Sequence, residues 1–185
     1  GFRVPHLVER VQWLESWPEV FEGVVLANEV LDAMPVHRFR VAADGGVEEQ
    51  FVGLDGERFS EIWSCPDDAR VERSIEKLVS ECSLTEGYVS ELNLAARDWT
   101  RQLASVLKRG AALVIDYGFP RREFYHPERS DGTLMCHYRH RSHQDPYRYV
   151  GLQDITTHVD FTAIAEAAHA AGLRVAGFTN QTNFL

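Results

Sequence analysis

An amide and two carboxylic acids closely follow an apolar run near the start of the chain. The run Val24–Ala27 is unbroken, and Asn28, Glu29 and Asp32 come soon after it. Glu29 and Asp32 are three residues apart, about one helical turn, so both carboxylates can point to the same side. A carboxylate pair can hold a cationic group through charge-assisted hydrogen bonds. The alternative is that Asn28 caps the following turn and both acids are solvated.

A second polar cluster follows the apolar run Ala111–Ile115. It consists of Asp116, Tyr117 and Gly118, and the glycine permits a tight turn or the close approach of a ligand. Ligands of open α/β sheets bind beyond the carboxyl ends of the strands. Asp116 is therefore expected beside Asn28 if the two apolar runs form neighbouring strands. A turn residue or helix cap is the alternative role for Asp116.

Three histidines at regular spacing raise the question of a metal site. His137, His140 and His143 lie three residues apart beside Cys136, with arginines between them. Zinc sites usually pair short spacings with a distant second pair, and arginines would add positive charge next to the ion. We therefore expect no metal and interpret residues 120–151 as an irregular lid or substrate-side loop. A solvated loop and a metal-dependent hydrolase that uses these histidines are the alternatives.

The sheet that would position these clusters is built from short apolar runs. Strands are expected at the two runs named above, at Val11–Leu14 and at Arg174–Phe178. Unbroken apolar runs are typical of parallel strands whose two faces are both covered. Residues 38–64 instead alternate between apolar and polar around two glycine turns, which predicts an inserted antiparallel β-hairpin.

Two segments with helical periodicity lie between the apolar runs. A helix is predicted from Tyr88 to Arg109, with Gly110 as its C-terminal cap. A second is predicted to be capped by Asp160 and closed by Gly172. Helix, glycine and apolar run in succession are typical of βαβ units. The predicted fold is therefore α/β and Rossmann-like, with a mostly parallel sheet and helices on both of its faces.

Composition narrows the class of partner. The 185 residues carry a formal net charge of −9, are 44% hydrophobic and include three cysteines. A hydrophobic fraction of this size excludes a disordered tail, and an odd number of widely spaced cysteines suits free thiols in a reducing compartment. Nucleic acids and anionic membranes require a dominant basic face, so neither is an expected partner. Cationic partners are compatible with this charge.

Several segments resemble the MidA family. These proteins are class I S-adenosylmethionine-dependent methyltransferases, related to the mitochondrial complex I assembly factor that dimethylates an arginine of a complex I subunit. The resemblance covers nearly the whole chain, and the segments occur in the right order. They are residues 27–36, 115–119, 123–127, 132–135 and 151–161, together with Gln181, Phe184 and Leu185.

The resemblance also implies which part of such a protein the chain represents. Residues 1–185 would form a partial methyltransferase domain, an interior piece that begins after the first two strands and their glycine-rich cofactor turn. S-adenosylmethionine is the implied cofactor. Trp13, Leu14 and Glu15 would lie beside its adenine, and Asn28 would orient the cofactor or the substrate.

The activity implied by the resemblance is N-methylation of a protein arginine, on a respiratory complex I subunit or a similar protein. Glu29 and Asp32 would clamp the guanidinium, and Asp116 and Tyr117 would complete the acceptor pocket. A second copy of the chain is a candidate partner. The expected location is the cytoplasm of a bacterium or the mitochondrial matrix of a eukaryote. A non-catalytic assembly scaffold with the same fold is the alternative.

Overall fold

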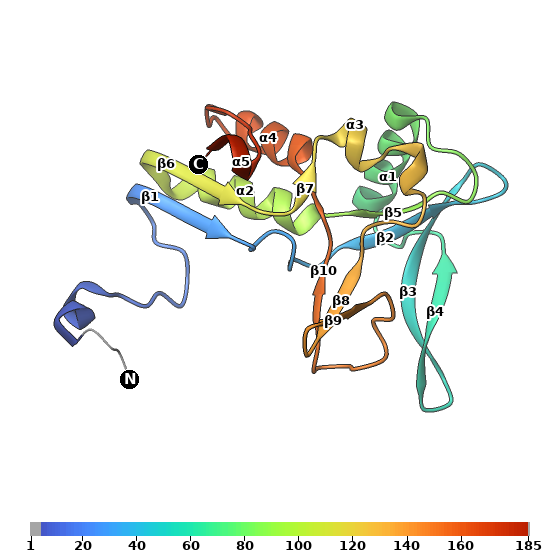
Figure 1. The fold of residues 1–185 in the computed structure, drawn as a ribbon. Coiled ribbons are helices and arrows are strands. Elements are labelled where there is room, and N and C mark those ends of the chain that lie inside the picture. Colours follow the sequence, from blue (N-terminus) through green and yellow to red (C-terminus); the bar gives the residue numbers. More distant parts are fainter. Residues whose placement is uncertain (1–4, 185) are drawn as a thin grey trace.

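The computed structural model describes residues 5–184, and a pair of parallel strands lies on the left in Figure 1, beside a helix. Strand β1 (Phe21–Asn28) pairs with β6 (Leu107–Ile115), and Asn28 lies opposite Ile115 in the register. Helix α2 (Leu94–Val106) packs on one face of the pair, where Trp99 of the helix and Val114 of β6 both pack against the buried cluster that contains Ala96. This confirms the predicted parallel α/β arrangement and both of the apolar runs expected as its strands.

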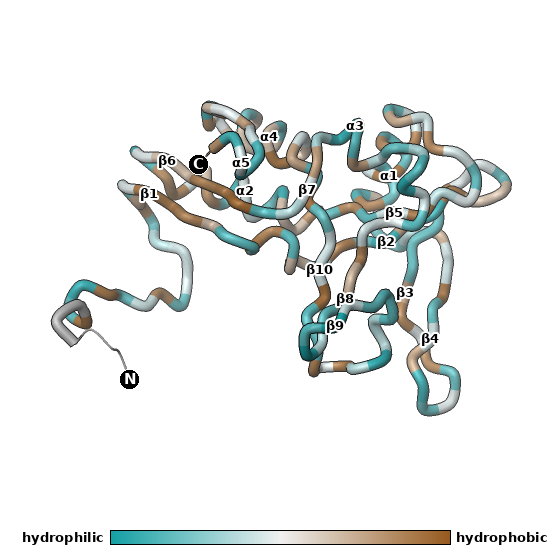
Figure 2. Tube along the Cα trace, in the orientation of Figure 1, coloured by the Kyte–Doolittle hydropathy of each residue, from teal (hydrophilic) through white to brown (hydrophobic). Residues whose placement is uncertain are grey.

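The other face of this strand pair is apolar and exposed. Val24 and Leu26 are 72% and 66% exposed, and Leu113 and Ile115 lie on the same side of the pair. Figure 2 shows the hydrophobic colouring that runs along β1 and β6. Within residues 5–184, the strand pair therefore has one face covered by helix α2 and one apolar face in contact with solvent. The prediction that helices cover both faces is thus not met among these residues, because none of their helices packs on the side of Val24 and Leu26.

A second, antiparallel sheet has the strand order β4-β3-β2-β5. Strands β2 and β3 form one hairpin and β3 and β4 a second, each with a glycine turn. This agrees with the antiparallel structure that the alternation of residues 38–64 predicted. Helix α1 (Ala69–Cys82) packs on one face of this sheet. The strands are β2 (His37–Val41), β3 (Val47–Asp55), β4 (Arg58–Ser64) and β5 (Val89–Leu92).

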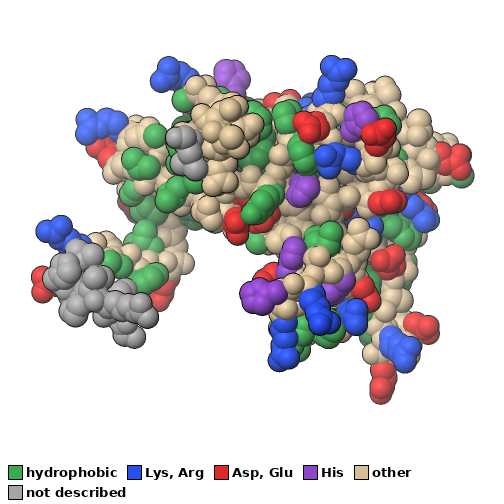
Figure 3. Space-filling view, viewed as in Figure 1, with side chains coloured by type: hydrophobic (Ala, Val, Ile, Leu, Met, Phe, Trp, Pro, Cys, Tyr) green, Lys and Arg blue, Asp and Glu red, His purple; other side chains and the backbone are tan. Residues whose placement is uncertain are grey.

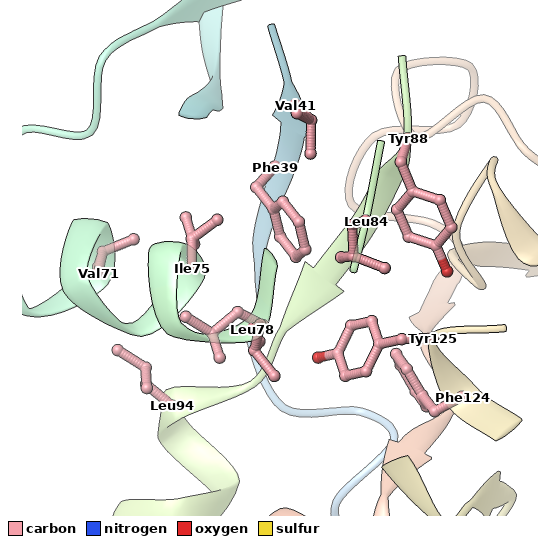
Figure 4. Packing of buried hydrophobic residues seen from close by; sticks show 11 residues of the cluster. Phe39, Val41, Val71, Ile75, Leu78, Leu84, Tyr88, Leu94, Phe124 and Tyr125 are labelled. Atoms are coloured by element: carbon pink, nitrogen blue, oxygen red, sulfur yellow. The ribbon is translucent and has the colours of Figure 1, made fainter. Parts of the chain in front are cut away.

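The larger hydrophobic core lies between helix α1 and the antiparallel sheet (Figure 4). Phe39 of β2, Ile75 of α1 and Leu92 of β5 are completely buried at its centre. Burying an aliphatic or aromatic side chain of this size contributes about 1.5–3 kcal/mol. This core fixes β2 and β5 in place, and with them the loop at residues 29–36 that precedes β2.

The predicted helix from Tyr88 to Arg109 is too long at both ends. Helix α2 begins after Asn93, whose side-chain oxygen accepts a hydrogen bond from the Ala96 amide at 2.8 Å. The residues before Asn93 form β5 instead, because pairing with β2 satisfies their backbone groups across the sheet. Those after Val106 enter β6 directly.

Gly110 is therefore not the cap of this helix. It lies inside β6 opposite Gly23 of β1, with a φ of 150°. A Cβ atom at this position would lie 1.8 Å from the carbonyl oxygen of Gly23. A glycine is therefore required here because the two strands approach each other closely, and it does not end a helix.

The strands predicted at Val11–Leu14 and Arg174–Phe178 are not formed. Both segments are irregular, and neither pairs with another strand among residues 5–184. A strand needs a neighbour to satisfy its backbone groups, and an apolar run without one cannot form a ladder. Trp13 and Phe178 in these segments are correspondingly exposed.

The C-terminal part adds two small sheets and a helix. Strand β7 (Gly118–Phe119) pairs in parallel with β11 (Val159–Asp160). Helix α4 (Phe161–Ala170) begins where Asp160 accepts a hydrogen bond from the Ala163 amide, which confirms that predicted cap. A three-stranded antiparallel sheet has the order β10-β8-β9. Its strands are β8 (Met135–Tyr138), β9 (Arg141–His143) and β10 (Asp154–Thr156).

Short helical turns complete the chain. They are α3 (Arg121–Phe124), α5 (Gln181–Phe184) and the 3-10 turns at Pro5–Arg10 and Pro127–Arg129. The stretch 120–151, predicted to be irregular, thus contains one helical turn, one 3-10 turn and the hairpin β8–β9. Among residues 5–184, no helix has both the length and the apolar character that crossing a bilayer requires.

Candidate active site

The two polar clusters lie side by side at the carboxyl ends of β1 and β6. Asn28 and Ile115 are partners in the register, and the Glu29 amide donates a hydrogen bond to the Ile115 carbonyl at 2.8 Å. Asp116 follows immediately on β6. The expectation that Asp116 lies next to Asn28 is therefore confirmed.

The Asp116 carboxylate fixes the loop that follows β1. Its Oδ2 atom accepts hydrogen bonds from the backbone amides of Val30, Leu31 and Asp32, at 3.2, 2.9 and 3.4 Å. The other oxygen accepts one from the Tyr117 amide at 2.9 Å. Several backbone amides directed at one carboxylate form an anion-binding concavity. Asp116 is thus placed as the anchor of the loop that carries the acids of the site.

Removing this anchor is expected to destabilise the protein. In Asp116→Ala, the three loop amides lose their acceptor, which should lower the free energy of unfolding by about 1–2 kcal/mol. Asp116→Asn retains an oxygen acceptor and should lose less than half as much. Denaturant titration of the full-length variants measures both. Equal unfolding midpoints for alanine, asparagine and wild type would show that the anchor has no energetic role.

Glu29 occupies an unusual backbone conformation. Its φ is 50°, in the left-handed region that residues with a Cβ atom rarely adopt. Such conformations cost about 1–3 kcal/mol and concentrate at functional sites. The side chains of Asn28 and Glu29 are both exposed at the edge of the sheet. The chain thus holds a carboxylate at the end of the strand at a cost in backbone energy.

Asp32 is the buried acid of the site. The residue is 7% exposed, and among the described residues its Oδ1 atom has no hydrogen-bond partner. Burial raises the pKa of Asp32, and the neighbouring charges of Asp116 and Glu29 raise it further. The backbone carbonyl of Asp32 accepts a hydrogen bond from the Thr157 amide at 2.9 Å. A buried acceptor without a partner suits a donor supplied by a ligand.

The raised pKa of Asp32 makes a prediction about stability and pH. In the window between the ordinary pKa and the raised folded one, the folded state binds more protons than the unfolded state. Stability therefore falls as pH rises through this window. Asp32→Asn lacks this decline, so at neutral pH its free energy of unfolding should exceed that of wild type, and the difference should shrink as the pH falls.

Thermal unfolding of wild type and Asp32→Asn across pH 3–8 measures the effect. The exposed Asp67 provides the matched control, because Asp67→Asn should leave the pH profile unchanged. A constant stability difference between wild type and Asp32→Asn at every pH would contradict the assignment.

Tyr117 lies between Asp116 of the candidate site and β7, which pairs in parallel with β11. Its ring is exposed, and its carbonyl accepts a hydrogen bond from the Val159 amide at 2.8 Å. A Cβ atom on Gly118 would lie 2.1 Å from the Val159 carbonyl oxygen. A tight turn or the approach of a ligand was predicted for this glycine, whereas the group that approaches it in the structure is the backbone of β11.

The residues predicted to contact adenine lie elsewhere in the structure. Trp13 is 80% exposed. Leu14 and Glu15 line an open pocket beside Phe21 and Val25, in the earlier part of β1. Asn28 does not line this pocket, so the structure does not bring the three residues to the polar edge.

The histidine stretch forms part of the three-stranded sheet. Cys136 is completely buried in β8 and lies opposite His143 of β9. His140 lies in the turn between these two strands. In the part of the chain that the structure describes, no three His, Cys, Asp or Glu side chains are grouped so that they could hold a metal ion.

A buried acid that the sequence analysis did not single out supports the site. The Glu91 carboxylate of β5 accepts hydrogen bonds from the Thr133 amide at 2.9 Å, the Thr133 hydroxyl at 3.1 Å and the Leu134 amide at 3.3 Å. The same hydroxyl oxygen accepts one from the His158 amide at 3.0 Å. Through Thr133, Glu91 thus connects the segment before β8 to residues 157–158, and Thr157 in turn contacts Asp32. Asn93 is the signal that could have revealed it, because an N-cap there places Glu91 outside the helix.

The assembled edge is acidic. Glu29, Asp32 and Asp116 converge at the ends of β1 and β6, and none of them forms an ion pair with another residue between 5 and 184. Because the Asp116 carboxylate already accepts the loop amides, the acceptors left for a ligand are the carboxylates of Glu29 and Asp32 and the amide oxygen of Asn28. Such an edge can bind a cationic group and align it by charge-assisted hydrogen bonds.

Comparisons with known proteins give matches over most of the chain. Residues 3–179 match a family described as "Putative S-adenosyl-L-methionine-dependent methyltransferase". Relatives named protein arginine methyltransferase NDUFAF7, mitochondrial, are 28% identical over 85% of the chain in Mus musculus and 29% identical over 85% in Danio rerio. The matches span only 34% and 36% of these relatives' lengths.

A solved structure gives a nearer comparison. It is a crystal structure of a protein from Burkholderia thailandensis bound to S-adenosyl-homocysteine. The TM-score is 0.84 with 47% sequence identity, and the match covers 92% of this chain and 43% of that one. A native crystal structure from the same organism matches with a TM-score of 0.85.

Proposed function

Because the chain belongs to this family of S-adenosyl-L-methionine-dependent methyltransferases, we propose that it forms the acceptor side of an enzyme that methylates an arginine of a protein substrate. The observation that carries the proposal is the unpaired acidic edge formed by Glu29 and Asp32 beside Asn28. The arginine methyltransferases among the relatives support the choice of acceptor. A respiratory complex I subunit is the substrate suggested by the family resemblance.

The residues of the edge suit a cationic cofactor and a cationic acceptor. The cofactor, when bound, supplies an activated methyl group on a positively charged sulfur. Asn28 is exposed at the end of β1 and offers an amide that can orient either molecule. The buried oxygen of Asp32 that lacks a partner among residues 5–184 provides the acceptor for an N–H donor. The amide of Asn28 and the acceptor oxygen of Asp32 are therefore chemically compatible with S-adenosyl-L-methionine, the cofactor of the family.

Glu29 and Asp32 are proposed to hold the acceptor guanidinium. Arginine stays protonated and its charge is delocalised over three nitrogens, so it is a weak nucleophile. Two carboxylates that bind one side of the guanidinium draw positive charge toward themselves and fix the direction of the far nitrogen. Correct positioning supplies much of the rate of such a transfer. In this proposal Asp116 and Tyr117 shape the pocket, and Asp116 acts through the loop that it anchors.

The test uses the full-length protein that contains this chain. Calorimetry with S-adenosyl-homocysteine is expected to show binding, and a labelled methyl group is expected to appear on arginine in a protein substrate. Binding of the cofactor without transfer to arginine would contradict the choice of acceptor. The expected location, bacterial cytoplasm or mitochondrial matrix, and a second copy of the chain as partner remain predictions.

A further inference from the structure

The hairpin β8–β9 and the turn that follows it carry an exposed cationic surface. Arg139, Arg141 and Arg148 are all exposed there, and Asp145 is the one acid between residues 137 and 149. In Figure 3, Lys/Arg and His side chains gather over the end of the molecule where this hairpin lies. We call Arg139, Arg141, Arg148, Tyr138 and Tyr149 the basic hairpin surface.

Cation–π contacts with two stacked tyrosine rings order two of these arginines. The rings of Tyr138 and Tyr149 stack with centroids 4.4 Å apart. The guanidinium of Arg139 lies 5.2 Å from the Tyr138 ring centroid, and that of Arg148 lies 5.2 Å from the Tyr149 ring centroid. Cation–π contacts at these distances are attractive. The side chains are thus partly ordered before any partner binds, which lowers the entropy lost on binding.

The turn of the hairpin holds a strained conformation that projects Arg139. Tyr138 and Arg141 pair across it, so Arg139 and His140 are its two central residues. Their φ values are 48° and 62°. A two-residue turn of this kind strongly favours asparagine and glycine. Here it contains two large cationic or aromatic side chains, and retained strain of this type is a mark of function.

These arginines have no acidic partner within the described chain. None of the ion pairs between residues 5 and 184 includes Arg139, Arg141 or Arg148. Other arginines on the same molecule are paired, as Arg70 is with Asp98 and Arg121 with Glu166. In a chain of net charge −9, acidic groups are abundant, yet among the described residues no acid, the nearby Asp145 included, forms an ion pair with these three arginines.

The basic hairpin surface is connected to the candidate active site. Strand β10 pairs with β8 in the same small sheet. The residue directly after β10 is Thr157, whose amide donates the hydrogen bond to the Asp32 carbonyl. A protein segment bound at the acidic edge can therefore continue across this sheet.

We propose that the basic hairpin surface binds an acidic segment of the same protein substrate, next to the arginine held by Glu29 and Asp32. This inference rests on the proposed function. Arginine side chains bind carboxylates through paired hydrogen bonds, and two of them are already ordered here. A nucleic acid is disfavoured, because the net charge of −9 on the whole chain would repel a long polyanion.

The direct test is binding of a fluorescein-labelled hexaglutamate peptide to the full-length protein, followed by fluorescence anisotropy. The variant R139Q/R141Q/R148Q should bind at least about tenfold more weakly than wild type, since three exposed ion pairs are lost. The matched control is R58Q/R73Q/R122Q, which removes the same charge from exposed arginines without ion pairs in the described structure. It should stay within about twofold of wild type. A hexaglutamine peptide should not bind.

Equal losses in the two triple variants would overturn the proposal, because the effect would then come from net charge alone. Binding of hexaglutamine as tight as that of hexaglutamate, or tighter binding of a single-stranded oligonucleotide, would also overturn it. Binding of the peptide is measured without methyl transfer. The assay therefore tests the basic hairpin surface even if the proposed catalytic function is wrong. With an arginine peptide that carries an acidic segment, R139Q/R141Q/R148Q should raise KM about tenfold and leave kcat unchanged.

Discussion

Replacing Glu29 by glutamine is expected to lower kcat for methyl transfer on the order of 100-fold, while S-adenosyl-homocysteine binds as to wild type. The substitution keeps the size of the side chain and its left-handed backbone but removes the negative charge. Without that charge, the guanidinium is no longer drawn to one side and its far nitrogen is not held in line. Transfer of labelled methyl by the full-length enzyme gives kcat, and calorimetry gives the affinity.

Glu57 supplies the control for this experiment. It is exposed in the turn between β3 and β4 and forms no ion pair within the described residues, so Glu57→Gln should retain wild-type turnover. Unchanged turnover in Glu29→Gln would refute the proposed clamp. Loss of cofactor affinity in step with turnover would instead place Glu29 on the cofactor.

Replacing Glu91 by alanine is expected to lower the free energy of unfolding by about 3–5 kcal/mol. The carboxylate is completely buried and accepts three hydrogen bonds from Thr133 and Leu134. Its Oε1 atom also lies 3.9 Å from Nε of Arg38. Burial raises the pKa of Glu91, while these hydrogen bonds and the Arg38 charge oppose the rise. Removal leaves the donors of Thr133 and Leu134 without this acceptor and takes a negative charge away from Arg38, which still donates a hydrogen bond to the Gln50 side chain at 3.0 Å.

Urea titration of the full-length variant measures this loss. Glu91→Gln keeps one oxygen acceptor and should fall between alanine and wild type, which gives a readable result even if the alanine variant does not fold. Glu76, exposed on α1, is the matched control, and Glu76→Ala should change stability by no more than about 0.5 kcal/mol. A Glu91→Ala variant as stable as wild type would show that the network contributes nothing.

The parts of the fold that could be predicted were those in which local pattern and tertiary environment agree. The apolar runs of β1 and β6 are buried on one face by α2, and their order in the chain placed Asn28 and Asp116 at one edge. The alternation of residues 38–64 matches a sheet with one face on the core. These features depend on apolar runs, on alternation and on the order of the segments, all of which the sequence displays directly.

Other parts could not be predicted, because they depend on contacts between distant residues. The segment before Asn93 has a helical pattern, but pairing with β2 makes it a strand. Val11–Leu14 is apolar, but among residues 5–184 no strand lies beside it. The roles of Asp116 and Glu91 follow from hydrogen bonds to residues more than 40 positions away in sequence. The N-cap at Asn93 places Glu91 outside the helix, but no local signal identifies the distant residues that either acid binds.

The left-handed conformation of Glu29 has a consequence for laboratory evolution. Glycine adopts this conformation without a steric penalty, so Glu29→Gly would relieve about 1–2 kcal/mol of backbone energy. A library screened for heat resistance alone should therefore enrich glycine at this position and recover robust but inactive clones. A library screened for turnover should retain glutamate and find its stabilising substitutions elsewhere. The outcomes of these two screens would diverge at this codon.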